Sequence, residues 1–542
     1  MTQEEELVSR AERRWLVRAC AAVMALTCLP YLFGLLITPP GLHYMGFLSN
    51  PDEHNVYMSW MRQAADGKFL FLDLFTTEPQ RAGFFHIFFL ALGLAARLTH
   101  LPLPIVYHAA RVACGWLLLW AVYVFAARCG ADERGRRLAF FLAAFSAGLG
   151  WLFYFMLPEG SPNPVDFGRG LIMPEAITFL TILMNPLFAL SAALMVFCFI
   201  FCRDALEKNS WKAAVGAGVL ALLLGNMHSY DLFPLGFGVA LYAVGLMLLQ
   251  RRVPWPGVLK LFAAALIASP SLAYQVYLFQ ANPVFREKAS TATESPGLLW
   301  LALGLGFPLV GAALAIAQGA FSASRLSRLL LPAAWAVSSL VVADMMPVSF
   351  QRKMAEGVHV PICILAALWA SRFLPTSKGR RQVAAIAGIV LLASISNIFF
   401  LARGFRDLVA NNMTYRQNLM PPLYLTDGDK AAFNWLRRRC GGEAVLCANF
   451  VGSYLPGQTG CKVYIGHWAE TLHFRRKVKN LMIFLNAETP DGWRRQLIRE
   501  HRLGYLLFGP FERALATWKP EDSELAIPAF RSGEVSIYRL RP

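Results

Sequence analysis

Charged residues are scarce in this chain of 542 residues, where Asp, Glu, Lys and Arg together make up 16% of the sequence. Soluble proteins contain about 25% of these residues. Hydrophobic residues reach 56% and aromatic residues 13%, and apolar runs of about 20 residues, each long enough to cross a bilayer, recur between 15 and 402. The composition excludes a soluble protein and a single-anchor protein, and it predicts a polytopic α-helical membrane protein.

Acidic residues are especially few, with 34 Asp and Glu against 51 Lys and Arg, so the net charge is +17. In a soluble chain this excess would suggest nucleic acid as a partner. Here the basic residues lie in short loops between apolar runs, where they report topology instead. They form six clusters, separated by enough apolar sequence for two crossings each: Arg10, Arg13 and Arg14; Arg128, Arg134, Arg136 and Arg137; Arg203, Lys208 and Lys212; Arg251 and Arg252; Arg325 and Arg328; and Arg372, Lys378, Arg380 and Arg381.

This spacing predicts about eleven spans, with a cytoplasmic amino terminus, an extracytoplasmic carboxyl terminus and a long first outer loop at 39–107. The apolar segment 84–98 is short and contains His86 and Arg97, so we place it as an amphipathic helix in the membrane interface. Counting it as a span would invert all later loops. The predicted spans are 15–38, 108–128, 138–157, 176–202, 213–228, 232–250, 258–280, 297–318, 329–343, 357–372 and 384–402.

The composition becomes mixed and polar from about residue 403, which predicts a membrane module at 1–402 and a soluble α/β domain at 403–542. Residues 466–471 follow a strand and precede a helix, the usual place for loop chemistry in α/β folds, although a helix cap with a packed Trp is the alternative. We predict helices at 429–439, 474–485 and 493–501, and strands at 444–447, 463–466, 505–508 and 535–540.

The cysteine pattern gives little information about function. Seven of the ten cysteines lie in or beside predicted spans, where they are expected to be small buried hydrophobes. Cys440, Cys447 and Cys461 fall in the carboxyl-terminal domain. In an oxidising compartment two of these three could pair in one disulfide. No Cys-x-x-Cys or His spacing indicates zinc.

The strongest chemical feature is Asn50-Pro51-Asp52-Glu53-His54 in the first outer loop. Two adjacent carboxylates and an imidazole at a bilayer surface are costly unless they are hydrated, paired or used. They can supply a general base with a supporting acid or His. Pro and acidic residues also begin helices, so a simple helix start is the alternative reading, and both can hold at once.

Further ionisable residues lie at other predicted outer helix ends. Glu175, His228 and Asp231 are the most unusual, because apolar sequence flanks them closely. Convergence of such groups from distant positions is what a site at the bilayer surface would produce, whereas outer loops also carry polar residues without function. The less distinctive members are Glu159, Asp166, Asp344, Gln351 and Glu356.

Basic residues in these outer loops are candidates for holding a phosphate. Arg352 and Lys353 are adjacent, and an Arg binds two phosphate oxygens in a fork. The alternative is a basic pair that reaches toward lipid headgroups. Arg81, Arg286 and Lys288 are weaker candidates for the same role.

The layout resembles the GT-C superfamily of integral-membrane glycosyltransferases, which use polyprenyl-phosphate-linked sugars. It has a short amino terminus, one span, a long outer loop that starts with an acidic pair, and then interfacial helices. The stretch from Phe84 through Gly93 to Arg111, followed by a span that ends in Arg128 to Arg137, is similar to the protein mannosyltransferase and aminoarabinose transferase branch. The resemblance covers most of residues 1–400.

This resemblance implies that Asp52 is the catalytic first-loop aspartate, with Glu53 as its acidic neighbour, and that Arg352 binds the lipid phosphate. The remaining residues would shape the donor and acceptor site or a cation site: His54, Arg81, Glu175, His228, Asp231 and Lys353. The implied reaction inverts the anomeric centre and moves sugar from a polyprenyl-phosphate donor to a lipid, glycan or protein acceptor. A divalent cation is left open.

The implied location is the bacterial inner membrane, with the terminal domain periplasmic, in contact with membrane lipids and without nucleic acid. The oligosaccharyltransferase branch carries a Trp-Trp-Asp signature in its carboxyl-terminal domain. The chain lacks this signature, so transfer to Asn is disfavoured.

Two other classes of function compete with the enzyme. A transporter or flippase of lipid-linked sugars would place its charges in broken helices at midmembrane, often in repeated halves. A scaffold would bind through the outer domain alone. Replacing Asp52 by Asn separates the three: an enzyme loses sugar transfer, a transporter loses only lipid movement, and a scaffold is unaffected. Sugar transfer and lipid movement are measured in reconstituted vesicles.

Overall fold

The computed structural model describes residues 8–156, 171, 173–289, 291–376, 379–410 and 421–542. The chain forms two compact units. The helical unit comprises Met1–Leu29, His108–Val276 and Ala292–Arg403, and the mixed unit comprises Pro30–Tyr107, Tyr277–Thr291 and Gly404–Pro542. The sequence division at 402 placed 30–107 and 277–291 in the membrane module, whereas the compact units group these segments with the terminal part of the chain.

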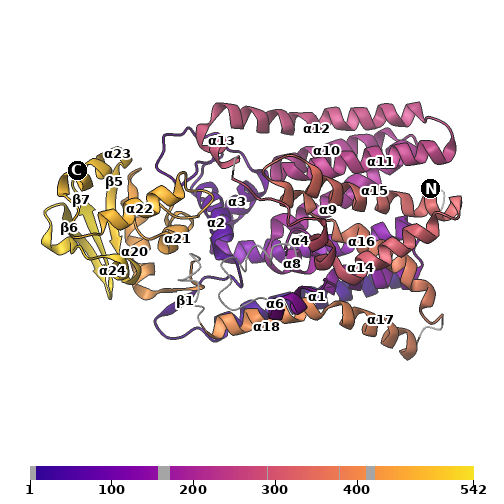
Figure 1. Cartoon of the computed structure of the whole chain (residues 1–542), viewed down its shortest axis with the longest axis horizontal. Helices are drawn as coiled ribbons and strands as arrows, with labels where there is room; N and C mark the ends of the chain where they lie inside the picture. The colour runs from indigo at the N-terminus through magenta and orange to yellow at the C-terminus, as the bar shows by residue number, and fades with distance from the viewer. Residues whose placement is uncertain (1–7, 157–170, 172, 290, 377–378, 411–420) are drawn as a thin grey trace. The chain divides into compact units, whose positions relative to one another are not determined.

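Nine helices in the described part of the chain are long and apolar enough to cross a membrane. A helix rises about 1.5 Å per residue, so about 20 residues span the hydrocarbon core. The polytopic helical fold is thereby confirmed, and the helices are drawn in Figure 1. Their bounds are Arg10–Leu36, Leu103–Arg128, Glu133–Phe153, Pro186–Glu207, Ser229–Gln250, Trp255–Ala281, Leu298–Gly319, Ala323–Met345 and Gln351–Phe373.

The count of eleven spans is too high by these criteria. The predicted span 213–228 is helix α10 (Trp211–Met227), which has 17 residues and is a shorter apolar helix. The predicted span 384–402 is two helices, α17 (Arg380–Ala393) and α18 (Ile395–Val409), bent by 61°. The bend falls at Ser394, whose hydroxyl donates to the carbonyl of Val390, so counting this pair as one span gives ten.

Contacts within the helical unit bear on the first outer loop. Arg136, at the start of α5 (Glu133–Phe145), pairs with Glu12 at 3.0 Å. Tyr123, near the end of α4 (Leu103–Arg128), donates a 2.8 Å hydrogen bond to the same carboxylate. The start of α1 (Arg10–Leu36) therefore lies beside the end of α4. The loop between these two helices must contain an even number of crossings, as predicted when 84–98 is not counted as a span.

Segment 84–98 forms the short helix α3 (Ile87–Thr99), with 13 residues. At about 1.5 Å per residue it is shorter than the hydrocarbon core. His86 caps it by accepting a hydrogen bond from the Phe89 amide. Its predicted location in the membrane interface stays a prediction.

The mixed unit contains a five-stranded sheet with the order β4-β3-β5-β7-β6. The strands β3 (Ala444–Leu446), β4 (Lys462–Val463) and β5 (Leu503–Phe508) are parallel. The hairpin of β6 (Ala526–Ser532) and β7 (Val535–Leu540) completes the sheet, and β7 runs antiparallel to β5. The sheet and its helices are visible in Figure 1.

Helices cover both faces of this sheet. Two neighbouring residues of β5 show this, because successive side chains of a strand point to opposite faces. Leu506 packs in one core with α22 (Phe474–Phe484) and α23 (Asp491–His501). Tyr505, its neighbour, contacts Trp435 of α20 (Asp427–Leu436) with ring centroids 5.6 Å apart. The predicted α/β domain is thus confirmed.

Strand β6 and helix α21 (Asn449–Thr459) were not predicted. Strand β6 lies at an edge of the sheet and contains Pro528, and Pro within a run weakens a strand prediction. Helix α21 likewise contains Pro456. In both elements an internal proline interrupts the residue pattern from which a strand or helix is predicted.

The first outer loop belongs to the mixed unit through two sets of contacts. Strand β1 (Leu42–Tyr44) pairs antiparallel with β2 (Tyr424–Thr426). Helix α2 (Pro51–Ala65) packs on α21, where a Cβ at Gly457 would lie 2.8 Å from the Cβ of Met58. This close approach requires glycine and brings the middle of α2 against α21.

Cys440 and Cys461 form a disulfide that closes a loop with a sequence separation of 21, while Cys447 is buried and free. Closing a loop of this length stabilises a domain by about 3 kcal/mol. We expect the double variant C440S/C461S to lower the thermal unfolding midpoint of the protein. Reducing agent should lower the midpoint of the wild type and leave that of the double variant unchanged. Equal midpoints for oxidised wild type and variant would contradict the stabilising role.

Candidate functional site

Asp52 lies in the first turn of α2, after Asn50 and Pro51. Its side chain is buried, with a relative exposure of 4%, whereas the side chain of Glu53 is partly exposed. Helix amino termini favour carboxylates, so the helix start and the functional reading coexist. Burial raises the pKa of Asp52 above its ordinary value, the charge of His467 opposes this rise, and the charge of Glu53 adds to it.

His467 is the imidazole next to this carboxylate. Its Nε2 lies 3.7 Å from Oδ2 of Asp52 and 3.8 Å from Oε1 of Glu53. Its Nδ1 accepts hydrogen bonds from the amides of Ala469 and Glu470 at 3.1 and 3.2 Å. An Nδ1 that accepts carries no proton, so in the neutral ring the proton is on Nε2 and faces the two carboxylates.

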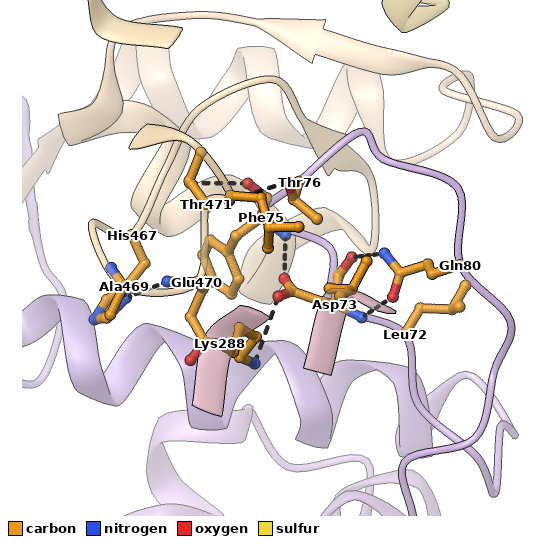
Figure 2. Close-up of polar contacts among 12 residues, drawn as sticks. Leu72, Asp73, Phe75, Thr76, Gln80, Lys288, His467, Ala469, Glu470 and Thr471 are labelled. Carbon is orange, nitrogen blue, oxygen red and sulfur yellow. Dashed lines mark hydrogen bonds and ion pairs between the residues drawn. The ribbon is translucent and has the colours of Figure 1, made fainter. Parts of the chain in front are cut away.

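The loop that carries His467 is held by Thr471. The hydroxyl of Thr471 donates to the carbonyl of Phe75 at 2.9 Å and accepts from the amide of Gly466 at 3.0 Å. The amide of Thr471 also donates to the carbonyl of His467. Figure 2 shows Thr471 and Phe75 in contact, with His467 at the other end of the same loop. The imidazole is therefore fixed in position by backbone contacts.

A charge triad of the buried Asp73 and the partly buried Lys288 and Glu470 supports the same loop (Figure 2). Lys288, on α13 (Pro283–Ala289), lies 3.4 Å from Oδ2 of Asp73 and forms an ion pair with Glu470. Oδ1 of Asp73 accepts from the amide of Phe75 at 2.9 Å. Burial raises the pKa of Asp73 to about 6 against the opposing charge of Lys288. Burial alone would lower the pKa of Lys288, but Glu470 and Asp73 raise it.

A second ionisable cluster lies in the helical unit. Arg352 pairs with Glu175 at 3.0 Å, and Nδ1 of His228 lies 2.9 Å from Oδ1 of Asp231. Glu356 is fully buried and interacts electrostatically with Asp231 and Glu175. Three buried carboxylates thus share one Arg and one His. Because a buried uncompensated charge is costly, this group requires a bound proton or another cation.

Several predicted site residues have other surroundings. His54 donates from Nδ1 to the carbonyl of Asn50 at 2.8 Å, and its ring lies against Phe47 and Tyr107. Arg81 is exposed. The structure thus places His467 beside Asp52 and gives His54 a structural role in the first turn of α2.

The predicted phosphate-binding residues also differ from one another. Lys353 lies over the ring of Tyr230 at 4.9 Å, and Arg352 has Glu175 as its partner. Arg286 donates to the carbonyl of Phe279. Lys288 is paired with the carboxylates of Asp73 and Glu470. The predicted outer-loop residues Glu159 and Asp166 lie outside the described residues.

Sequence reasoning missed Asp73 and assigned no role to His467. Asp73 is a single acid within the apolar run Phe69-Leu70-Phe71-Leu72-Asp73-Leu74-Phe75. This is the same signal that marked Glu175 and Asp231, so it could have been found. The partners of Asp73 and of His467 are hundreds of residues away and leave no local pattern.

No family model and no curated protein matches the chain. The fold is similar to three solved GT-C enzymes. A variant of the arabinofuranosyltransferase AftD from Mycobacteria has a TM-score of 0.54 and 14% identity, over 98% of this chain and 42% of that protein. ArnT from Cupriavidus metallidurans, bound to undecaprenyl phosphate, has a TM-score of 0.53 and 12% identity, over 98% of both chains.

The third is the archaeal oligosaccharyltransferase AglB from Archaeoglobus fulgidus, in complex with an inhibitory peptide and a dolichol-phosphate. It has a TM-score of 0.51 and 11% identity, over 92% of this chain and 70% of that protein. These identities are low, so the similarity shows the fold. The chain has the fold of GT-C integral-membrane glycosyltransferases, as the sequence layout predicted.

Replacing Lys288 by Met should destabilise the mixed unit, because Asp73 and Glu470 would lose their shared cation. Removing one partner of a buried ion pair costs about 3–5 kcal/mol. We expect K288M to lower the thermal unfolding midpoint of the full-length protein, and D73N/K288M/E470Q to recover part of the loss. The control K479M changes an exposed lysine and should have no effect. Equal midpoints for K288M and K479M would contradict the role of the triad.

Proposed function

We propose that the chain is a glycosyltransferase that moves a sugar from a polyprenyl-phosphate-linked donor to an acceptor at the outer membrane face. The observation that carries this proposal is the buried carboxylate of Asp52 beside His467, in a chain with a GT-C fold. The bound undecaprenyl phosphate of ArnT and the dolichol-phosphate of AglB support a lipid-linked donor.

Asp52 is proposed as the general base. Its raised pKa makes it a better proton acceptor than an exposed carboxylate. His467 would donate Nε2–H toward Asp52 and hold the carboxylate in one orientation. This contact, at 3.7 Å, is longer than a hydrogen bond and would shorten when substrate is bound. Glu53, 3.8 Å from the same Nε2, would share this proton.

The proposed reaction is a single displacement at the anomeric carbon. The acceptor's hydroxyl or amine forms a bond to this carbon as its proton passes to Asp52. The bond from the same carbon to the phosphate oxygen breaks, and the electron pair leaves with the polyprenyl phosphate. Phosphate is a good leaving group, so no general acid is needed, and attack opposite to the leaving group inverts the configuration.

Arg352 and Lys353 are proposed to bind the donor's phosphate. Arg352 would have to exchange Glu175 for the phosphate, since the pair is formed in this structure at 3.0 Å. Glu175 would then lose its guanidinium partner. Its negative charge would be balanced within the cluster that it forms with His228 and Asp231. A guanidinium that is already held by a carboxylate is pre-oriented, so less conformational entropy is lost when the phosphate binds.

A divalent cation would stabilise the leaving phosphate in the same way as these basic residues. Within the described residues no group of three or more His, Cys, Asp or Glu side chains is arranged to hold a metal ion. Titration of the purified enzyme with EDTA and then with Mn²⁺ or Mg²⁺ decides the metal requirement.

One observation favours the competing transporter. Helix α14 (Leu298–Gly319) is interrupted at Gly306, which has φ 57° and ψ −134°. Interrupted helices and buried intramembrane acids are features of transporters. The enzyme and the transporter differ in products, because only the enzyme breaks the sugar–phosphate bond. Release of radiolabelled sugar from a panel of polyprenyl-phosphate donors, followed in reconstituted vesicles, distinguishes them.

The pH dependence of transfer tests the pairing of Asp52 with His467. A base with a raised pKa loses activity as the pH falls through that pKa, so the acid limb of the rate profile should lie above the ordinary carboxyl pKa of 3.8. The charge of His467 lowers the pKa of Asp52. Replacing His467 by Gln should therefore move the acid limb to higher pH.

The matched control is H43Q, since His43 pairs with Asp427 instead. An acid limb at the same pH in H467Q and wild type would show that His467 does not act on the base. Absence of turnover by the wild type with every donor would instead contradict the proposed function.

A further inference from the structure

A pocket of about 300 Å³ lies at one end of the helical unit. It is formed by the turn between α4 and α5, the first turns of α15 (Ala323–Met345) and the end of α16 (His359–Ala370). Three arginines line it: Arg325, Arg328 and Arg372. Small-molecule sites have volumes of about 300 Å³ and more, so this pocket lies at the lower end of that range. The three arginines come from two of the basic clusters that the sequence places on the cytoplasmic side.

Within the described residues, several basic side chains at this end of the helical unit are paired with carboxylates, whereas the pocket arginines are not. Asp132, the acid in the pocket wall, pairs with Arg134 at 2.8 Å. Arg325, Arg328 and Arg372 are exposed, and in the described part of the chain none of the three has an acidic partner. The paired side chains are Arg128 and Lys208 with Asp204, Arg136 with Glu12, Arg137 with Glu133, and Arg203 with Glu207.

The arrangement keeps these charges close together. Arg325 and Arg328 are three residues apart and share one face of α15, where like charges repel. The side chain of Arg328 packs over Gly130, which has a φ of +80°, and a Cβ there would lie 3.3 Å from Cδ of Arg328. Arg372 donates to Gln318 at 2.8 Å. A bound anion would relieve the repulsion between the guanidinium groups.

We propose that this pocket binds a phosphate group of an anionic phospholipid. Guanidinium groups match phosphate oxygens in a forked geometry, and basic pockets between the ends of membrane helices are suited to lipid headgroups. The pocket lies at the ends of predicted spans, which is where a phospholipid phosphate is found. A soluble phosphate ester offers the same chemistry and is the other source to be tested.

This site is separate from the proposed donor phosphate site at Arg352. Helix α15 has 23 residues, so its ends are about 34 Å apart at about 1.5 Å per residue. Arg325 and Arg328 lie in its first two turns, and Arg352 follows its other end. The proposal is therefore independent of the proposed function.

Native mass spectrometry of the delipidated full-length protein tests the proposal. Phosphatidylglycerol and zwitterionic phosphatidylcholine are titrated in parallel against the wild type, the variant R325Q/R328Q/R372Q and the control R14Q/R18Q/R252Q. The control removes the same three charges from exposed arginines outside the pocket. We expect the first phosphatidylglycerol to bind at least about 10-fold more weakly to the pocket variant, because three charge-assisted contacts are lost, and with wild-type affinity to the control.

Glycerol 3-phosphate and inorganic phosphate are then used as competitors. If they do not displace phosphatidylglycerol at millimolar concentration, the lipid is the ligand. If either binds the pocket as tightly as the lipid, the phosphate chemistry is correct and the lipid source is wrong. Equal loss in the pocket variant and the control, or equal binding of phosphatidylcholine, overturns the proposal. Equal thermal unfolding midpoints for the three proteins exclude misfolding as the cause of a loss.

Discussion

The free-energy cost of burying charged groups determines how the ionisable residues of this protein are arranged. A carboxylate or ammonium group away from water must be paired, hydrogen-bonded or neutralised. In the mixed unit, Asp73, Lys288 and Glu470 meet this requirement as a triad that joins three distant segments. In the helical unit, Glu12 meets it with Arg136 and Tyr123. The candidate base Asp52 meets it only in part, since one of its buried oxygens has no hydrogen-bond partner in the described residues, and buried oxygens of Glu175, Asp231 and Glu356 share this condition.

The loop at 466–471 supplies the imidazole that faces Asp52. Asp52 begins a helix whose amino terminus stabilises its charge, and His467 faces it with a fixed tautomer. The triad and Thr471 hold the loop in which His467 lies. A buried, incompletely satisfied carboxylate beside an imidazole is the arrangement expected of a base that awaits a substrate proton.

Much of the fold could be predicted because its signals are local. Apolar runs predicted the nine long apolar helices of the described residues, and the helices predicted at 429–439, 474–485 and 493–501 follow from periodicity. The first loop's membership in the mixed unit could not be predicted, because it depends on pairing between β1 and β2, nearly 400 residues apart. The same holds for the site: Asp52 stands out in sequence, but its partner His467 is identified only by tertiary contact.

The GT-C fold does not by itself decide the acceptor. AglB is an oligosaccharyltransferase with a similar fold, yet this chain lacks the Trp-Trp-Asp signature that its sequence would need for that branch. A fold hosts many functions, and the chemistry resides in the site. For this chain the buried Asp52 beside His467 carries the functional argument.

The central claim is that Asp52 accepts a proton during sugar transfer. Its most direct test is single-turnover transfer from radiolabelled polyprenyl-phosphate sugars by protein reconstituted in lipid, with wild type, D52N and the control D66N side by side. Asp66 ends the same helix and is partly exposed. The account predicts that D52N binds the donor but does not transfer the sugar, while D66N behaves as wild type. Equal turnover by D52N and wild type would contradict it.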